Sequence, residues 1–161
     1  MKDTLKEILP SLRKFAFSLT GNLHDADDLL QNTVEKLLQK PVPDDVPVLA
    51  WSFRVCRNLW IDEYRANKVR QAAVNKPELQ EPVQHDAEKI TASLTLRQVT
   101  DAMEELPDDH RDVLSLVAVQ GMSYREASEV LSVPSGTIMS RLARARARLA
   151  DVLKLTPEAF S

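Results

Sequence analysis

A row of arginines near the C-terminal end of the sequence is the strongest indication of chemistry in this chain. Arg141, Arg144 and Arg148 follow Thr137 at the spacing that puts all four on one face of a helix. An apolar stripe repeats in the same way one residue later, at Ile138, Leu142, Ala145 and Leu149. Guanidinium groups bind phosphates and the edges of guanine. The pattern therefore predicts a helix that packs on one side and faces nucleic acid on the other.

The residues before this helix complete a helix-turn-helix. Ser123 followed by Glu126 matches a capping box at the start of a short helix, and Pro134 suits the first position of the next helix. The second helix of such a motif enters the major groove with its N-terminal residues near base edges. The side chains expected to reach bases are Ser135, Thr137, Ser140 and Arg141. Those expected to meet phosphates are Arg144, Arg146 and Arg148.

Composition places this motif in an all-α chain of 161 residues. Only three glycines and 5% aromatic residues favour helices packed on helices. The net charge of −3 is unevenly distributed. Residues 51–76 carry six Lys or Arg against two Asp or Glu, and residues 110–150 carry six against three, whereas residues 77–109 carry two against nine. Two basic segments indicate either two surfaces that face nucleic acid or, equally well on charge alone, solvated helix faces.

The periodicity divides the chain into two small helical domains. Helical spacing predicts helices from Leu5 to about Thr20, from about His24 to Gln39, and from about Val48 to Arg70. A loop containing Pro41, Pro43 and Pro47 precedes the third helix. The predicted domains are residues 1–70 and 87–155, joined by a flexible linker over residues 71–86. The length of this linker argues against a single compact core.

Several function classes are disfavoured. The single cysteine, Cys56, excludes an intramolecular disulfide and sits among apolar residues, as a buried thiol does. The three histidines are scattered, so we expect no enzyme activity, and neighbouring aspartates on a helix diverge, so we expect no metal and no cofactor. No segment has the uninterrupted apolar length of a membrane span. We expect a cytoplasmic protein without membrane insertion.

Two segments resemble the extracytoplasmic-function sigma factors of bacterial RNA polymerase. Residues 25–38, DADDLLQNTVEKLL, and residues 51–65, WSFRVCRNLWIDEYR, resemble region two of that family. Residues 106–149 resemble region four. The resemblance covers nearly the whole chain in the family's order. It implies a sigma region two bundle of three helices, a region four helix-turn-helix, and a function in transcription initiation.

The resemblance also implies a role for each surface. It implies that the second helix docks on the clamp helices of the polymerase β′ subunit through Asp25, Asp28, Leu29, Gln31 and Asn32. It implies that the proline-rich loop and the third helix handle the promoter minus-ten element through Trp51, Arg54, Arg57, Asn58, Asp62 and Arg65. It implies that the minus-thirty-five element is read by Ser135, Thr137, Ser140, Arg141, Arg144 and Arg148. An anti-sigma factor is the further expected partner, and the free chain is expected to be a monomer.

Two of these interpretations have alternatives from the residues alone. Without the resemblance, the acidic face of the second helix reads as ordinary helix surface. Trp60 fits the core, whereas Trp51 fits base stacking and the core equally well. Two other binding functions also stay open: a sigma-like decoy that occupies an anti-sigma factor, and a helix-turn-helix regulator that dimerises on DNA without polymerase.

Overall fold

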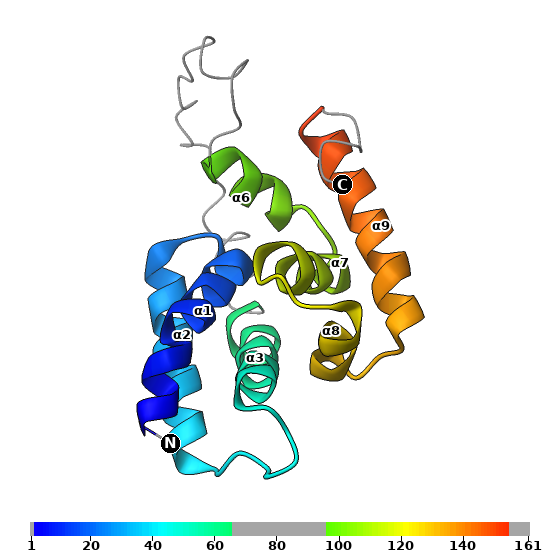
Figure 1. Ribbon diagram of the computed structural model, residues 1–161. Coiled ribbons are helices and arrows are strands. Elements are labelled where there is room, and N and C mark those ends of the chain that lie inside the picture. The colour runs from blue at the N-terminus through cyan, green and yellow to red at the C-terminus, as the bar shows by residue number, and fades with distance from the viewer. Residues whose placement is uncertain (1, 66–95, 155–161) are drawn as a thin grey trace.

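The chain is built from helices throughout the residues that the computed structural model describes, 2–65 and 96–154 (Figure 1). The first range contains α1 (Lys2–Thr20), α2 (Leu23–Gln39), α3 (Val48–Leu59) and the π-helical segment η1 (Trp60–Arg65). The second range contains α6 (Leu96–Glu104), α7 (Asp108–Leu114), the π-helical segment η2 (Ser115–Val119), α8 (Tyr124–Leu131) and α9 (Ser135–Val152). The predicted all-α class is confirmed. The predicted linker, residues 71–86, lies outside the described residues.

The first three helices form a bundle around the predicted apolar stripe of α1. Leu12, Phe15 and Leu19 are fully buried, and the Phe15 ring centroid lies 4.8 Å from that of Phe53 on α3. Gly21 adopts a left-handed φ of +83°, which ends α1 and is a conformation that glycine takes without strain. The Asn22 side chain then accepts a hydrogen bond from the backbone of Asp25 at 2.8 Å and caps α2. The boundaries of these helices therefore follow from local sequence signals.

Cys56 of α3 and Trp60 of η1 were both predicted to lie in the core of the bundle. Cys56 is fully buried, as predicted, and burial raises the pKa of its thiol to about 12 although a hydrogen bond with Thr33 lowers it. Trp60 is also buried, as the apolar spacing predicted, so its ring supports the bundle. Both residues are structural.

In residues 96–154, α8 and α9 form a helix-turn-helix that packs on α7 and η2. The capping box is present at the start of α8, and Ser132 turns the chain with a left-handed φ of +56°. Pro134 is the residue before α9, because its ψ of 151° is extended, so the helix begins one residue later than predicted, at Ser135. The α9 stripe packs against α7 and α8. The predicted architecture of the motif is confirmed.

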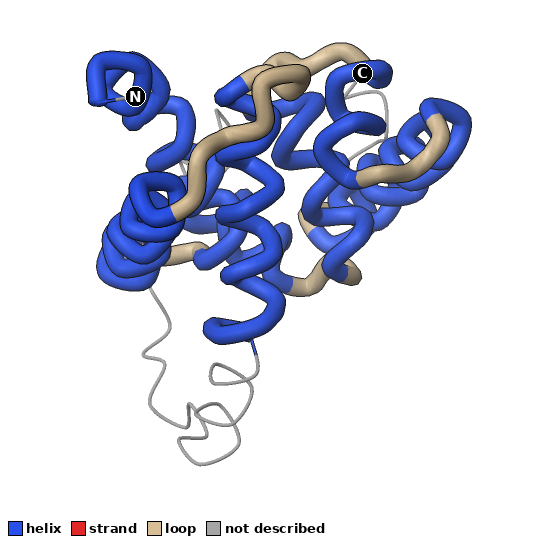
Figure 2. The backbone as a smooth tube through the Cα atoms, turned by 90° about the horizontal axis from the view of Figure 1, so that it is seen from below, coloured by secondary structure: helices blue, strands red, loops and turns tan. Residues whose placement is uncertain are grey.

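The two helical units lie directly against each other. Figures 1 and 2 show one body in which α8 lies beside α3, and α1 also contacts η2 and α6. The buried residues of both units form one continuous cluster. The regions predicted as two domains therefore contact each other, and the boundary between them stays a prediction because residues 71–86 lie outside the described residues. A membrane-spanning segment is not found among the helices of residues 2–65 and 96–154.

Candidate nucleic-acid interface

The outer face of α9 is open to solvent. Ser135, Ser140, Arg144 and Arg148 are exposed, whereas Thr137 and Arg141 are half-buried. The Arg141 side chain is 28% exposed. Its Nε lies 3.9 Å from Oδ2 of Asp109 on α7. Asp109 of α7 therefore orients one arginine of the face, and the exposed arginines extend the cationic surface toward the end of α9.

Met139 is a candidate contact that the sequence interpretation missed. Its side chain is 54% exposed on the second turn of α9, between the buried Ile138 and the exposed Ser140. The signal was available, because Met139 is out of phase with the apolar stripe that packs inward. An exposed thioether beside arginines adds an apolar contact to an otherwise polar face.

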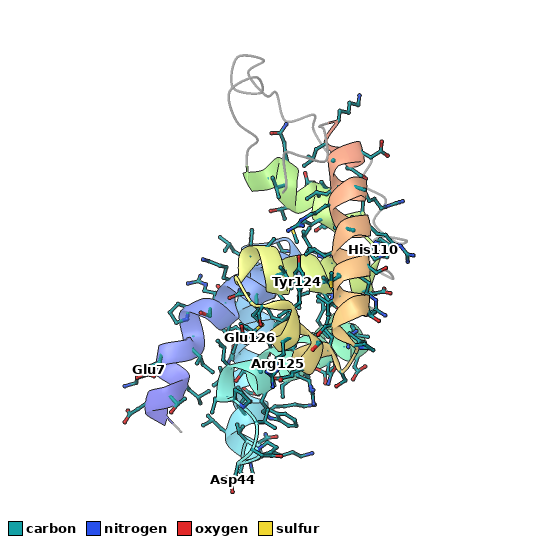
Figure 3. All side chains as sticks on the ribbon, turned by 45° about the vertical axis from the view of Figure 1, so that its right-hand side comes forward. Glu7, Asp44, His110, Tyr124, Arg125 and Glu126 are labelled. Carbon is teal, nitrogen blue, oxygen red and sulfur yellow. The ribbon has the colours of Figure 1, made fainter. Side chains whose placement is uncertain are left out.

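The start of α8 fixes the geometry of the motif. The Ser123 hydroxyl accepts a hydrogen bond from the Glu126 backbone at 3.1 Å, and the Glu126 carboxylate accepts one from the Ser123 backbone at 3.0 Å. The hydrogen bond that the Ser123 backbone amide donates to the carboxylate lowers the pKa of Glu126, and the Ser123 side chain lowers it further. Figure 3 shows Glu126 with its exposed neighbours Tyr124 and Arg125 at this end of α8. Two backbone amides at the start of α8 that lack partners within the helix are therefore hydrogen-bonded. This fixes where α8 begins.

A shallow cavity lies between α2 and α3. Its volume is about 190 Å³, and it brings together three residues predicted for minus-ten DNA, namely Trp51, Asn58 and Asp62. Trp51 is half-buried, whereas Asn58 and Asp62 are exposed. Lys36 and Lys40 line the same cavity and were not predicted. A cavity with an indole wall and a lysine rim has the features that a single-stranded base and its phosphate require.

Arg54 faces the second unit instead of solvent. Its Nε donates a hydrogen bond to the Val130 carbonyl at 3.1 Å, and its Nη2 donates to the Ser132 hydroxyl at 3.0 Å and to the Glu129 carbonyl. Its guanidinium also lies 5.8 Å from the centre of the Trp51 ring. Arg54, which was predicted to contact minus-ten DNA, is therefore hydrogen-bonded to the C-terminal end of α8.

Arg57 is held by a buried carboxylate. Its Nε lies 2.7 Å from Oδ2 of Asp112, and only 2% of the Asp112 side chain is exposed. Burial raises the pKa of Asp112 to about 6, Arg57 lowers it through its hydrogen bond and charge, and Asp108 and Asp109 raise it. The side chain of Arg65, the last arginine of the predicted set, lies outside the described residues.

The acidic and amide face of α2 is the third surface. Asp28 and Gln31 are exposed, whereas Asp25 and Asn32 are half-buried, and the Asp25 carboxylate accepts a hydrogen bond from the Asn22 side chain at 2.7 Å. Leu29 has 0% exposure and lies in the core. The expectation that Leu29 contacts polymerase is therefore corrected, because its side chain has no surface to offer. Its role is to anchor the helix that carries the polar residues.

Comparison with known proteins gives the family of the chain. A family model of sigma-70 region 2 matches residues 5–70, and one of sigma-70 region 4 matches residues 96–149. The chain is 35% identical to the ECF RNA polymerase sigma factor EcfG of Rhodopseudomonas palustris, across 95% of this chain and 84% of that protein. The chain belongs to the extracytoplasmic-function RNA polymerase sigma factors. It is also 31% identical to the sigma factor SigM of Bacillus subtilis, across 84% of each protein.

Solved structures of sigma factors have the same fold. The sigma factor RpoE of Bartonella quintana, solved in complex with the anti-sigma factor NepR, matches with a TM-score of 0.71 and 31% identity over 95% of this sigma factor and 96% of that chain. The anti-anti-sigma factor PhyR of the same organism matches with a TM-score of 0.63 at 18% identity, over 93% of this chain and 49% of that one. The second match shows the fold alone. The sequence relationships, which reach named sigma factors, favour the sigma factor over a decoy of similar fold.

The buried carboxylate of this sigma factor predicts a pH-dependent stability. Asp112 binds its proton more tightly in the folded chain than in the unfolded chain, where its pKa is near the usual 3.8. Unfolding therefore releases a proton between about pH 4 and 6, and the free energy of unfolding falls as the pH rises through this window. Lowering the pH from 7 to 5 is expected to add about 1 kcal/mol through this group.

Urea unfolding at the two pH values, compared between the wild type and Asp112→Asn, measures this contribution. The variant should lose that share of the pH response. Asp101→Asn, at an exposed carboxylate of α6, is the matched control and should keep it. An identical pH response in Asp112→Asn and the wild type would contradict the assignment.

Proposed function

We propose that this sigma factor directs initiation by binding the RNA polymerase core through α2 and promoter DNA through two separate surfaces. Membership in the family makes it a transcription initiation factor. The observation that carries the proposed division of labour is the solvent-open cationic face of α9 on a completed helix-turn-helix. The first domain, proposed as residues 1–70, would hold core and the minus-ten element, and the second, proposed as residues 87–155, would read the minus-thirty-five element in the cytoplasm.

Each proposed surface has the chemistry that its partner requires. Asp28 and Gln31 form an exposed polar patch on α2 that complements a basic helix pair such as the β′ clamp helices. The cavity containing Trp51 and Asn58 suits an unpaired base of the melted minus-ten strand. Arg144 and Arg148 suit the phosphates that flank the minus-thirty-five bases. Polymerase would hold both DNA contacts at once, so neither needs a high affinity alone.

Reconstituted transcription tests this function. The purified chain is mixed with core polymerase and a library of promoter fragments, and the 5′ ends of the transcripts are mapped. We expect start sites that appear only when the chain is present and that share upstream elements at two fixed positions. Failure to associate with core, together with tight binding to a symmetric operator by a dimer, would instead identify a polymerase-independent regulator.

An anti-sigma factor is the proposed regulatory partner. The similarity to RpoE, solved with NepR, supports it. A partner of this kind would cover the α2 face that polymerase needs, so the co-purified pair should not bind core. A decoy would give a different outcome, because it would bind the anti-sigma factor while failing to bind core on its own.

Met139 is proposed to contact a thymine methyl group in the minus-thirty-five element. Its exposed thioether is in the N-terminal half of α9, where recognition helices meet base edges. Replacing the contacted thymine by deoxyuridine removes only the methyl group, so it should weaken holoenzyme binding by about threefold to tenfold. Met139→Ala should bind the two DNAs equally. A scan in which every deoxyuridine affects the wild type and Met139→Ala alike would refute the contact.

A further inference from the structure

We propose that Lys36 and Lys40, at the C-terminal end of α2, bind backbone phosphates of the minus-ten strand, so that α2 holds polymerase with its first half and DNA with its end. This inference rests on the proposed function, which places an unpaired base in the cavity between α2 and α3. The family resemblance assigns α2 to polymerase alone, and the proposed base contacts Trp51 and Asn58 lie on α3. The two lysines therefore add a DNA contact to a helix that had none assigned.

The cavity has one side that suits a base and one side that suits a phosphate. Trp51, Val55 and Leu59 follow one another at helical spacing and give the α3 side an indole and an apolar lining. Lys36 and Lys40 form the α2 side. A base that stacks on an aromatic ring keeps its sugar and phosphate at the outer edge of the site, where cations that follow the backbone are needed.

Asp62 determines on which side of the cavity a phosphate can lie. Its carboxylate is exposed and lines the α3 side, so it repels a phosphate toward the lysines of α2. Arg54 and Arg57, the arginines predicted for this strand, donate hydrogen bonds to acceptors of the second unit. Both cations in the described lining of this cavity therefore come from α2.

The two lysine side chains are available to an anion. Both are exposed, and none of the ion pairs within residues 2–65 and 96–154 involves Lys36 or Lys40. They are four positions apart, and like charges at this spacing on a helix repel each other. A bound phosphate would relieve that repulsion.

Stabilisation of the helix end is the other role that these lysines could have. Lys36 is in the last turn of α2, where a cation interacts favourably with the negative end of the helix dipole. That role predicts a lower free energy of unfolding on removal of the charge and no change in DNA binding. Stability and strand binding are therefore measured on the same variants.

Strands with single uncharged phosphate analogues test the assignment. The full chain with core polymerase is titrated onto fluorescent single strands that carry the minus-ten sequence of a promoter mapped by reconstituted transcription. In each strand one phosphate is replaced by a methylphosphonate, and the titrations are repeated over a range of salt concentrations. Lys36→Gln and Lys40→Gln each remove one charge, whereas Lys36→Arg and Lys40→Arg keep it. Lys14→Gln, at an exposed lysine of α1 outside the described lining, is the matched control.

We expect each glutamine variant of α2 to bind the strand about threefold to tenfold more weakly and to lower the slope of log affinity against log salt concentration by about 0.7. Each should also become insensitive to one methylphosphonate that weakens binding of the wild type. The arginine variants and Lys14→Gln should bind the strand as the wild type does, and core affinity should be unchanged in all five variants.

The proposal is overturned if both glutamine variants of α2 keep the salt slope and the methylphosphonate pattern of the wild type, or if Lys14→Gln causes the same loss. A lower free energy of unfolding with unchanged strand binding would also overturn it, in favour of a role at the helix end. The wild type separates these outcomes from failure of the proposed function. If the wild type starts no transcription with core, the proposed function is wrong and the lysine assignment fails with it.

Discussion

Arg141→Ala and Arg144→Ala are each expected to lower promoter-specific transcription by about tenfold to a hundredfold while leaving association with core polymerase intact. Arg141 is oriented by Asp109 in the N-terminal half of α9, so its loss should remove discrimination at one base pair. Arg144 is exposed one turn further along, so its loss should weaken binding to all promoters alike and reduce the dependence on salt concentration. Transcription from wild-type and single-base variant promoters, together with a separate measurement of core affinity, distinguishes the two effects.

Arg125→Ala is the matched control for both substitutions. Arg125 is a highly exposed arginine on α8, and its Nε lies 3.7 Å from the carboxylate of Glu129 one turn away on the same helix. Its replacement makes the same change of charge outside α9. A comparable loss of transcription in Arg125→Ala would show that overall charge, and not the α9 face, determines promoter use.

Asp28→Lys is expected to have the opposite profile, with core affinity reduced by about a hundredfold and binding of the minus-thirty-five duplex unchanged. Asp28 is exposed on α2, which packs against α1 and α3 in the first unit. Placing a lysine opposite a basic partner helix costs several kcal/mol through repulsion between like charges. Core affinity is measured by competition with a labelled sigma factor, and duplex binding is measured in the free chain.

Asp27→Lys controls for the change of charge at almost the same place. Asp27 is exposed one residue earlier and therefore points about 100° away around the helix. It pairs with Arg13 at 3.1 Å at the surface, and such exposed pairs contribute little to stability. Equal loss of core affinity in the two variants would contradict a defined docking face on α2.

Local signals in the sequence predicted most of the fold. The stripe of α1, the capping box at Ser123 and the cap at Gly21 depend on residues within one or two helical turns, so their effects can be read without the rest of the chain. The one-residue error at Pro134 has the same local origin, since a proline fits both the last residue before a helix and the first within it.

The packing between the units was not predictable in the same way. An amphipathic pattern shows which side of a helix is buried and does not show what covers it. Arg57 and Asp112 are separated by 55 positions, and each reads in sequence as an ordinary surface residue. Arg54 and Arg57, which the family resemblance assigns to DNA, instead donate hydrogen bonds to acceptors of the second unit, and no local pattern in the sequence indicates these partners. Leu29 was misassigned for a related reason, because resemblance to a family motif does not state which side of the helix each position occupies.

The location of Cys56 has a consequence for how this transcription factor reacts with oxidants. Peroxides and disulfides react with thiolates, and burial raises the pKa of this thiol to about 12, which keeps it protonated at neutral pH. The only sulfhydryl in these 161 residues is therefore inert as well as inaccessible. An oxidant would therefore reach Cys56 only when the bundle opens, so modification of this thiol is expected to report unfolding of the first three helices.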